Sequence, residues 1–381
     1  MRRNVLMIGW ELPPFNSGGL GVASFEMAKA LAEKTKLFFT LPFKFPIKIK
    51  EFPLIFGKVK PDEQPVCAYG SYGNSDVLKK QVREYGKNLE PKIKKLGVKF
   101  DVIHAHDWLS APAALYLKKK LHVPVILHIH ATEYDRCPHL PDAEIVEIEK
   151  ECLEQADLIV TVSHSTKEVV KKNYDIDDEK IVPLPNGIDF EEMPSIEPEY
   201  INHLKQQGNK IVLFVGRFAG QKGPDQLLDT LPLVKKHVPV KYVFAGSGDL
   251  FGSLIRQAAH HRTLSDVVFS GFLRDEQLWS LYKIADVLVV PSISDPFGLV
   301  PLEGIKYKTP VIVSRTTGAG DYISHILKAD FWDTERMANL IVSLLRYGPL
   351  RDEMTENAYQ EIPKFNWKHR ADALIKIYEK I

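Results

Sequence analysis

The sequence predicts an α/β protein that consists of two doubly wound domains, each built around a parallel sheet. Short apolar runs, of the kind found in strands buried on both faces, alternate with amphipathic helical stretches. This alternation is typical of βαβ units. The runs fall into two sets, and Pro183, Pro185, Pro194 and Pro198 cluster between the sets. We therefore expect a domain junction near residues 186–198.

The first set of expected strands starts close to the N-terminus. Its strands are Val5–Ile8, Val102–His104, Val123–Leu127, Leu158–Val162 and Ile181–Leu184, and its helices include Val22–Lys34, Leu109–Lys120 and Ala143–Ala156. The first run follows Met1-Arg2-Arg3 as in a signal peptide, but it is short and Pro13-Pro14 comes soon after it. We interpret it as a buried strand. No apolar run approaches the roughly 20 residues that a membrane-spanning helix needs.

The second set of expected strands occupies the other half of the chain. Its strands are Ile211–Val215, Val240–Phe244, Val267–Ser270, Val287–Val290 and Val311–Val313, and its clearest helix is Pro224–His237. A different composition marks the segment from Phe43 to Gly73, which is rich in Pro, Lys and aromatic residues and has no clear period. We expect an irregular insertion or lid there, with Phe43–Phe56 able to contact a membrane surface or an acceptor glycan.

Composition narrows the class of protein. The 381 residues are 45% hydrophobic and 26% charged, which is ordinary for a soluble globular protein. Lys and Arg number 50 against 49 Asp and Glu, so no net positive field favours nucleic acid as a partner. Cys67, Cys137 and Cys152 have neither the spacing of metal ligands nor that of a disulfide framework. This cysteine usage fits a reducing, cytoplasmic location.

A glycine-rich turn follows the first expected strand. Ser17 and Gly18 lead into Gly19, Leu20 and Gly21, which open the first helix. Glycines let a ligand approach the backbone, and the amides of a helix N-terminus favour an anion. The spacing is not the Gly-x-Gly-x-x-Gly of dinucleotide-binding folds. A tight connection without a ligand would have the same sequence.

Two cations share a loop at the start of the second set. Arg217 and Lys222 lie between the strand Ile211–Val215 and the helix that begins at Pro224, among Gly216, Gly220 and Gly223. In open α/β sheets, ligands bind outside the carboxyl ends of the strands. A guanidinium, which binds in a bidentate manner, and an ammonium can converge there on one diphosphate. The alternative is a solvated turn with two surface cations.

Two carboxylates flank a turn that opens another helix. Asp295 and Glu303 lie on either side of Pro-Phe-Gly, after the strand Val287–Val290. The N–H groups of Gly298, Leu299 and Val300 would begin a helix, and such groups bind anions. This arrangement suits a sugar nucleotide, because the carboxylates can bind its hydroxyls and the amides can bind its phosphates. The alternative is an ordinary strand–turn–helix connection.

Two His-x-His pairs follow strands of the first set. They are His104 with His106, which Asp107 and Trp108 follow, and His128 with His130, which Glu133 follows. We expect the two histidines of each pair to face opposite sides of their strand, which argues against a zinc site. One histidine of each pair would then be packed and the other directed toward a ligand.

A last turn, Thr317-Gly318-Ala319-Gly320-Asp321, follows the strand Val311–Val313. It suits contact with a bound phosphate or nucleotide, or a plain helix cap. The dipeptide Asn186-Gly187 at the expected domain junction is more simply a turn than a ligand contact.

Together these motifs resemble the retaining, nucleotide-sugar-dependent glycosyltransferases of the GT-B fold, the class that includes glycogen and starch synthases. The resemblance rests on Ser17–Gly21, His104–Trp108, His130 with Glu133, Pro185–Asp189, Arg217 with Lys222, and Asp295 to Glu303, in the family's order. It covers nearly the whole chain and is weakest across Phe43–Gly97. One position departs from the pattern: Asp295 stands where the family usually has Glu.

The resemblance implies the GT-B architecture, in which two Rossmann-like domains face a deep cleft. Residues 1–190 would form the N-terminal, acceptor-side domain and residues 191–364 the C-terminal, donor-binding domain. The tail at 365–381 would be the family's final helix, which crosses back onto the first domain. Catalysis in the family requires no metal and no cofactor besides the nucleotide-sugar donor.

The resemblance also assigns roles to single residues. Arg217 and Lys222 would hold the diphosphate of the donor in place of a metal. Glu303 would accept the ribose hydroxyls, and the amides of Gly298, Leu299 and Val300 would meet the distal phosphate or the sugar. These assignments make Glu303, Gly298, Leu299 and Val300 donor-binding residues. Arg217 and Lys222 would be catalytic residues, together with His130, Asp107 and Asp295.

Further roles fall on residues of the first domain and on Asp295. Gly19, Leu20 and Gly21 would close over the donor phosphates. His130 would contact the sugar near its 6-hydroxyl, and Asp107 would lie on the acceptor side. Asp295 would bind the 3- and 4-hydroxyls of the sugar or stabilise an oxocarbenium-like centre.

The activity implied is transfer of a hexosyl unit, in the first place glucosyl, from UDP-glucose or ADP-glucose to an α-glucan acceptor. Two alternatives remain open. One is the same fold and donor class with a lipid-linked, sugar-phosphate or small-molecule acceptor. The other is a protein that binds sugar nucleotides without catalysis. The expected partners are a nucleotide sugar and a carbohydrate, with no nucleic acid and no integral membrane segment; homo-oligomer formation is left open.

Overall fold

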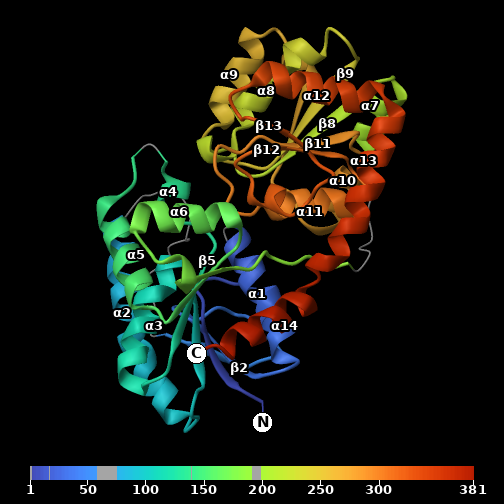
Figure 1. Cartoon of the computed structure of the whole chain (residues 1–381). Coiled ribbons are helices and arrows are strands. Elements are labelled where there is room, and N and C mark those ends of the chain that lie inside the picture. The colour runs from blue at the N-terminus through green and yellow to red at the C-terminus, as the bar shows by residue number, and fades with distance from the viewer. Residues whose placement is uncertain (1, 17, 58–74, 139, 191–198) are drawn as a thin grey trace. The chain divides into compact units, whose positions relative to one another are not determined.

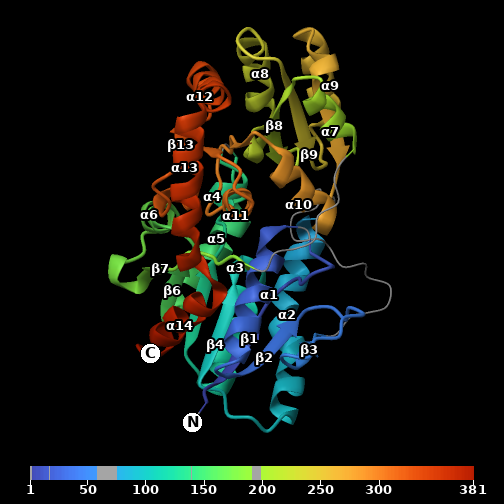
Figure 2. The same cartoon turned by 90° about the vertical axis from the view of Figure 1, so that its right-hand side faces the viewer.

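The computed structural model of the chain describes residues 2–16, 18–57, 75–138, 140–190 and 199–381. The chain divides into two compact units (Figures 1 and 2). Unit 1 comprises Met1–Gly187 together with Phe365–Ile381, and unit 2 comprises Ile188–Lys364. Each unit contains one parallel sheet with helices on its faces, so the predicted α/β class with two doubly wound sheets is confirmed.

The sheet of unit 1 has the strand order β3-β2-β1-β4-β5-β6-β7. Its strands are β1 (Asn4–Ile8), β2 (Lys36–Leu41), β3 (Leu54–Phe56), β4 (Val102–His106), β5 (Val125–Ile129), β6 (Leu158–Thr161) and β7 (Ile181–Pro183). All its paired strands are parallel, and the order reverses between β1 and β4. Loops that leave the carboxyl ends of these two strands diverge there, which creates the usual ligand position of such sheets.

The helices of unit 1 cover both faces of its sheet. They are α1 (Gly19–Ala32), α2 (Ser75–Lys95), α3 (Asp107–Leu121), α4 (Glu133–Arg136), α5 (Ala143–Gln155), α6 (His164–Tyr174) and the C-terminal α14 (Trp367–Tyr378). Leu6 and Ile8 of β1 belong to the core under α2, α3 and α5, whereas Val5 and Met7 belong to the core under α1 and α14 (Figure 1). Alternate residues of each buried strand therefore serve opposite faces.

The sheet of unit 2 has the strand order β10-β9-β8-β11-β12-β13, with its reversal between β8 and β11. Its strands are β8 (Lys210–Val215), β9 (Val240–Ala245), β10 (Val267–Gly271), β11 (Val287–Val290), β12 (Val311–Ser314) and β13 (Leu327–Ala329). Its helices are α7 (Glu199–Gln206), α8 (Pro224–Val234), α9 (Phe251–His260), α10 (Asp275–Ile284), α11 (Leu299–Lys306), α12 (Thr334–Arg346) and α13 (Gly348–Glu361). The core under α8, α9 and α12 fills one face of the sheet, and α11 packs against Leu288 on the other.

The expectation of an irregular segment after Phe43 is confirmed for residues 43–53, which form neither helix nor strand, but the buried aromatic side chains there do not fit a lid. Phe43 and Phe52 are buried, and the chain then forms β3, which pairs with β2. Lys44, Lys48 and Lys50 alternate with these apolar side chains and are exposed. The aromatic residues of this segment therefore belong to the core of unit 1. Residues 58–73, which the same prediction included, lie outside the described residues.

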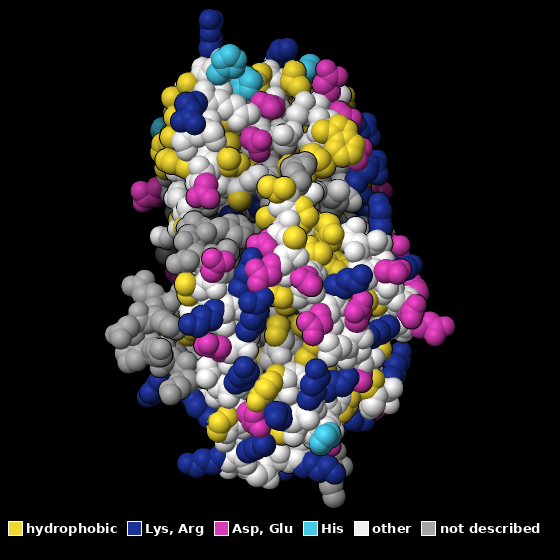
Figure 3. All heavy atoms as spheres, turned by 90° about the vertical axis from the view of Figure 1, so that its left-hand side faces the viewer, with side chains coloured by type: hydrophobic (Ala, Val, Ile, Leu, Met, Phe, Trp, Pro, Cys, Tyr) yellow, Lys and Arg dark blue, Asp and Glu magenta, His cyan; other side chains and the backbone are white. Residues whose placement is uncertain are grey.

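The surface agrees with the balanced composition. On the face of unit 1 that carries α2 and α5, acidic and basic side chains are interspersed, and neither sign forms a continuous patch (Figure 3). Among the described helices, none combines the length and the apolar character needed to cross a membrane.

Candidate functional site

Two loops meet at the carboxyl edge of the unit 2 sheet, where its strand order reverses. One loop joins β8 to α8 and carries Arg217 and Lys222; the other joins β11 to α11 and carries Asp295. Lys222 Nζ lies 2.9 Å from Asp295 Oδ2, and Ser292 Oγ donates to the same oxygen at 3.4 Å. The side chain of Asp295 is 9% exposed and that of Lys222 25%. Lys222, which was predicted to bind phosphate, and Asp295, which was predicted to contact the sugar, thus form an ion pair at the carboxyl edge of the sheet.

The backbones of these loops also touch. Gly223 has φ +63°, and a Cβ there would lie 2.3 Å from Pro291 O. Gln221 O accepts a hydrogen bond from Ile293 N at 2.9 Å. Because L-residues other than glycine disfavour this φ and no side chain fits the gap, glycine is required at position 223.

The turn around Asp295 is held from a third loop. Gly318 N donates to Asp295 O at 2.8 Å, and Ala319 N donates to Phe297 O at 2.6 Å. These two amides of the Thr317–Asp321 turn are therefore occupied by protein. The contacts support the structural interpretation of this turn over direct contact with a phosphate.

The N-terminus of α11 presents backbone amides at the same place. Gly298 has φ +82°, and α11 begins at Leu299 without a side-chain cap. No described residue accepts a hydrogen bond from the N–H groups of Gly298, Leu299 and Val300. These groups are suited to bind an anion.

Glu303, one turn further into α11, has a partner that sequence reasoning missed. Tyr282 Oη, on α10, donates to Glu303 Oε2 at 2.6 Å, and the tyrosine is fully buried. Burial raises the pKa of Glu303, and the hydrogen bond from Tyr282 acts against that rise. Tyr282 gives no signal in the sequence because it is one apolar position among several in an amphipathic helix.

A second feature missed by sequence reasoning supports the Arg217 loop. The turn after β9 contains Gly246 and Gly248; a Cβ on these residues would lie 1.9 Å from Gly216 O and 2.5 Å from Phe218 O. Phe218 N donates to Ser247 O at 2.8 Å. Arg217 itself is half-buried on the loop that these contacts hold. The Gly-x-Gly spacing directly after a strand was the available signal.

In unit 1, the glycine turn after β1 opens α1 as predicted from the sequence. Gly19 is the first residue of α1, and the N-cap Gly18 provides no side-chain hydrogen bond. Leu20 and Gly21 are buried, and a Cβ on Gly21 would lie 2.5 Å from Asn16 Cβ. Ser17, the first residue of the motif, lies outside the described residues.

The expectation that the histidines of each pair face opposite ways is wrong. Residues two apart on a strand share a face. His106 is paired with His128 in the register of β4 and β5, and the rings of all four histidines lie against one another, with centroids 4.5–5.4 Å apart. His104, His106 and His128 are buried, and His130 is half-buried.

Hydrogen bonds link these rings in two pairs. His104 Nδ1 lies 2.6 Å from Tyr378 Oη on α14, and its Nε2 lies 3.2 Å from His128 Nδ1. His106 Nδ1 lies 2.9 Å from His130 Nε2. Burial lowers the pKa of His130 to about 3 and that of the other three well below the ordinary range. All four rings are therefore neutral near pH 7.

The histidine cluster also bears on the question of a metal. His104, His106 and His128 each offer a nitrogen within 4.8 Å of the others, the one such group found among the described residues. Both nitrogens of His104 are already hydrogen-bonded, however, and the rings stack with nearly parallel planes. Lone pairs in parallel planes do not converge as tetrahedral ligands must, so this donor set does not fit a zinc ion.

Asp107 is placed so that it supports His130. It is fully buried, begins α3 with φ +55°, and its Oδ1 accepts hydrogen bonds from His130 N at 2.6 Å and Ala131 N at 3.3 Å. A positive φ is costly for aspartate, so the surrounding contacts must hold it. Its expected position on the acceptor side stays a prediction.

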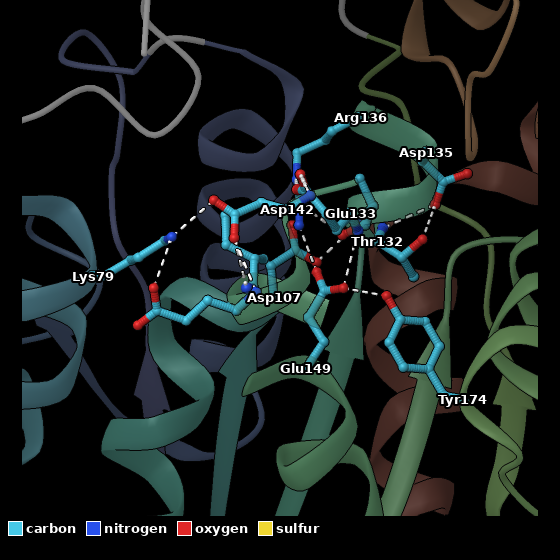
Figure 4. Close-up of polar contacts among 12 residues, drawn as sticks. Lys79, Asp107, Thr132, Glu133, Asp135, Arg136, Asp142, Glu149 and Tyr174 are labelled. Carbon is cyan, nitrogen blue, oxygen red and sulfur yellow. Dashed lines mark hydrogen bonds and ion pairs between the residues drawn. The ribbon is translucent and has the colours of Figure 1, made fainter. Parts of the chain in front are cut away.

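A buried ion network, which was not predicted from the sequence, fixes the same loop (Figure 4). Arg136 donates to Ala131 O at 2.8 Å and to Glu133 Oε2 at 3.0 Å, and it also pairs with Glu149. Tyr174 donates to Glu149, whose pKa is raised by burial and lowered in turn by Arg136. The side chains of Arg136, Glu133 and Glu149 are at most 6% exposed.

Each half of the chain matches a known protein family. Residues 17–192 match the family described as Glycosyltransferase Family 4, and residues 196–361 match the family described as Glycosyl transferases group 1.

Three curated relatives are informative. An uncharacterized glycosyltransferase of Methanocaldococcus jannaschii is 30% identical, over 98% of this chain and 97% of its own length. A glycogen synthase of Mycobacterium tuberculosis is 26% identical, over 98% of this chain and 94% of its own. A D-inositol 3-phosphate glycosyltransferase of Corynebacterium jeikeium is 27% identical, over 83% of this chain and 81% of its own.

Solved structures show the same fold. Sucrose-phosphate synthase from Thermosynechococcus elongatus aligns with a TM-score of 0.80 at 19% identity, covering 100% of this chain and 99% of that one. Anabaena HepE in complex with UDP and glucose aligns with a TM-score of 0.77 at 17% identity, covering 100% of both chains.

Proposed function

The chain belongs to the retaining glycosyltransferases of the GT-B fold, and on this premise we propose that it transfers a glucosyl unit from UDP-glucose or ADP-glucose to an α-glucan. The observation that carries the proposal is the ion pair of Lys222 and Asp295 beside the amides of Gly298, Leu299 and Val300. It places a cation, a carboxylate and anion-binding N–H groups at one edge of one sheet, which is the set that a sugar diphosphate needs.

Arg217 and Lys222 bind the diphosphate in this proposal. As the bond between the sugar and the phosphate breaks, negative charge grows on the leaving oxygen, and fixed cations stabilise it without reorganisation. The ammonium group of Lys222 has three donors, so it can keep Asp295 and still reach a phosphate oxygen. Glu303, oriented by Tyr282, accepts the ribose hydroxyls.

Asp295 then acts on the sugar. Its carboxylate binds sugar hydroxyls or stabilises positive charge at C1, and Lys222 and Ser292 fix its direction. The acceptor hydroxyl attacks C1 on the face from which the diphosphate leaves, and its proton passes to the departing phosphate oxygen. One C–O bond forms as the other breaks, and configuration is retained.

Two sets of residues within unit 1 have proposed roles of their own. The N-terminus of α1, at Gly19, Leu20 and Gly21, is suited to a phosphate oxygen because its N-cap residue, Gly18, gives its first amides no side-chain hydrogen bond. His130, held by Asp107, binds a sugar hydroxyl. We propose Asp107 as a positioning residue for His130, because its buried carboxylate oxygen accepts two backbone N–H groups.

A second acceptor class is favoured by a specific relative. The D-inositol 3-phosphate glycosyltransferase of C. jeikeium matches this chain at nearly the same identity as the glycogen synthase, 27% against 26%, although over 83% of the chain against 98%. A sugar phosphate is therefore the alternative acceptor. An assay that offers maltooligosaccharides, inositol phosphates and hexose phosphates separately, with one donor, separates the two.

The donor is tested first by binding. A donor at about 100 times its dissociation constant should add about 2.7 kcal/mol to the stability of the state that binds it. We expect thermal stabilisation by a nucleotide diphosphate sugar and a smaller effect in Lys222→Ala. A panel of UDP, ADP and GDP sugars of which none stabilises the wild type would contradict the proposal.

A further inference from the structure

His130 is held through both its backbone and its ring. Asp107 accepts its N–H at 2.6 Å, and ring Nε2 lies 2.9 Å from His106 Nδ1. His130 is half-buried, and no described residue bonds its Nδ1. This nitrogen is therefore the atom that the ring can offer to a ligand.

The hydrogen bond between the two rings can run in either direction, and each direction has a different consequence. A neutral imidazole carries one proton, so one of its nitrogens donates and the other accepts. If His106 Nδ1–H donates, His130 must carry its proton on Nδ1. If His130 Nε2–H donates instead, His130 Nδ1 becomes an acceptor, and His106 must carry its proton on Nε2.

The surroundings of His106 Nε2 decide which of the two rings donates the hydrogen bond. His106 is 1% exposed, and its Nε2 is enclosed without a hydrogen-bond partner among the described residues. An N–H donor left unpaired in the interior is rarer in proteins than an unpaired acceptor. The proton of His106 therefore belongs on Nδ1, where it has a partner.

We propose that His106 is a positioning residue that fixes His130 as its Nδ1–H tautomer, so that Nδ1 is a hydrogen-bond donor toward an oxygen atom of the ligand. The neighbouring His104 does not share this role, because its nitrogens bond Tyr378 and His128. Only the identity of the ligand oxygen, a hydroxyl of the donor sugar, rests on the proposed function; the tautomer does not.

The tautomer can be read directly in the full-length, ligand-free protein. Nitrogen-15 labelling of histidine and long-range proton–nitrogen correlation distinguish protonated from unprotonated ring nitrogens, and the signals of His130 are those lost in His130→Gln. We expect a protonated Nδ1 and an unprotonated Nε2 at neutral pH. A protonated Nε2 in the wild type overturns the proposal without any substitution at His106.

Two substitutions of His106 form a matched pair. His106→Asn keeps an N–H donor near the position of Nδ1, whereas His106→Gln moves its amide to the position of Nε2. We expect the Nδ1–H tautomer of His130 to persist in His106→Asn and to lose population in His106→Gln. His104→Asn, a control in the same cluster, should leave the tautomer unchanged; a change as large as that in His106→Gln would overturn the specific role of His106.

Kinetics separate the tautomer from the proposed function. If His130 donates to the donor sugar, His106→Gln raises KM for the nucleotide sugar about tenfold, the change expected for one lost hydrogen bond, and His106→Asn restores it. An unchanged KM together with the expected nuclear magnetic resonance result would leave the tautomer standing and overturn the sugar contact that the proposed function gives to His130.

Discussion

Lys222 Nζ and Asp295 Oδ2 lie 2.9 Å apart although 73 positions separate the two residues in the chain. The contact exists because β8 and β11 are neighbours in the sheet and their loops leave the same edge. It joins the group proposed to hold the diphosphate to the group proposed to act on the sugar. Loss of either partner should therefore disturb both functions.

Lys222→Ala should lower the rate of glycosyl transfer by roughly 10²–10³, the usual cost of one preorganised contact to developing charge. Lys205→Ala is the matched control, because Lys205 pairs with Asp286 at the amino edge of the same sheet at 3.3 Å. The initial rates of the two variants are measured at a saturating concentration of the donor. Equal activity in both variants would remove the phosphate role from Lys222.

Asp295 can be tested by charge and by length. Asp295→Asn keeps the shape and removes the charge, so it should lose transfer activity by a similar factor. Asp295→Glu restores the acid that the family usually carries there and should keep part of the activity. Full activity in Asp295→Asn would show that the charge is not needed.

Gly223→Ala should destabilise unit 2 and lower the rate of glycosyl transfer. Holding an alanine in the left-handed conformation costs about 1–2 kcal/mol, and its Cβ would also meet Pro291 O at 2.3 Å. Gly208→Ala isolates the conformational cost, because Gly208 has φ +84° and no atom within 4 Å of an added Cβ. Hydrogen exchange in β8 and β11 measures the difference. Similar losses in the two variants would exclude a role for the loop contact.

Tyr282→Phe keeps the ring but removes the hydrogen bond to Glu303. A hydrogen bond to a charged group is worth about 1.5–3 kcal/mol, so donor affinity should fall about tenfold or more. The loss should shrink when the donor lacks its ribose hydroxyls. An equal loss for the normal and the dideoxyribose donor would mean that Tyr282 does not act through Glu303.

Arg136→Met should destabilise unit 1 by about 3–5 kcal/mol, because it leaves Glu133 and Glu149 buried without their cation. Arg83→Met is the control: Arg83 pairs with Glu144, but its side chain is 58% exposed, and such pairs contribute about 0–1 kcal/mol. Urea unfolding followed by Trp fluorescence, in a background with Trp279 and Trp332 replaced by Phe, reports on unit 1. Comparable losses would contradict the buried network.

The buried histidines predict how the stability of unit 1 depends on pH. Their pKa values in the folded chain lie below the ordinary value near 6.5, so below about pH 6.5 the unfolded chain takes up protons that the folded chain does not. Above that pH, these histidines should contribute no pH dependence to the free energy of unfolding. It should fall at lower pH, by up to about 1.4 kcal/mol per pH unit for each histidine, down to their folded pKa values.

One substitution checks this dependence. His128→Asn keeps a polar group near Nδ1 but removes one titrating ring, so the slope below about pH 6.5 should fall by about one proton's contribution. The same slope in wild type and His128→Asn would show that His128 is not held neutral by burial.

Much of the fold could be predicted from the sequence. Alternation of buried strands and helices identified two parallel sheets, and the rule that ligands bind outside the carboxyl ends of strands put the loops of Lys222 and Asp295 at one edge, but the ion pair between them was not predicted. Three strands were not predicted. Among them, β3 and β13 are short edge strands with three residues each, too short for a period, and β2 begins with an exposed Lys36.

The remaining differences have physical causes of two kinds. The prediction that His104 and His106 face opposite sides of their strand was wrong, because residues two positions apart on a strand share a face. Tyr282 and Arg136 could not be predicted as site-supporting residues, because their role depends on partners such as Glu303 and Glu149 that only tertiary packing brings into contact.

The most direct test of the central claim is a transfer reaction with an anomerically pure nucleotide sugar, analysed by the configuration of the product. Purified wild type is incubated with UDP-glucose or ADP-glucose and a maltooligosaccharide or sugar-phosphate acceptor, and proton nuclear magnetic resonance reads the new linkage. An α-linked product that Lys222→Ala forms far more slowly is the result that we predict. A β-linked product, or a rate that does not depend on Lys222, would contradict the account.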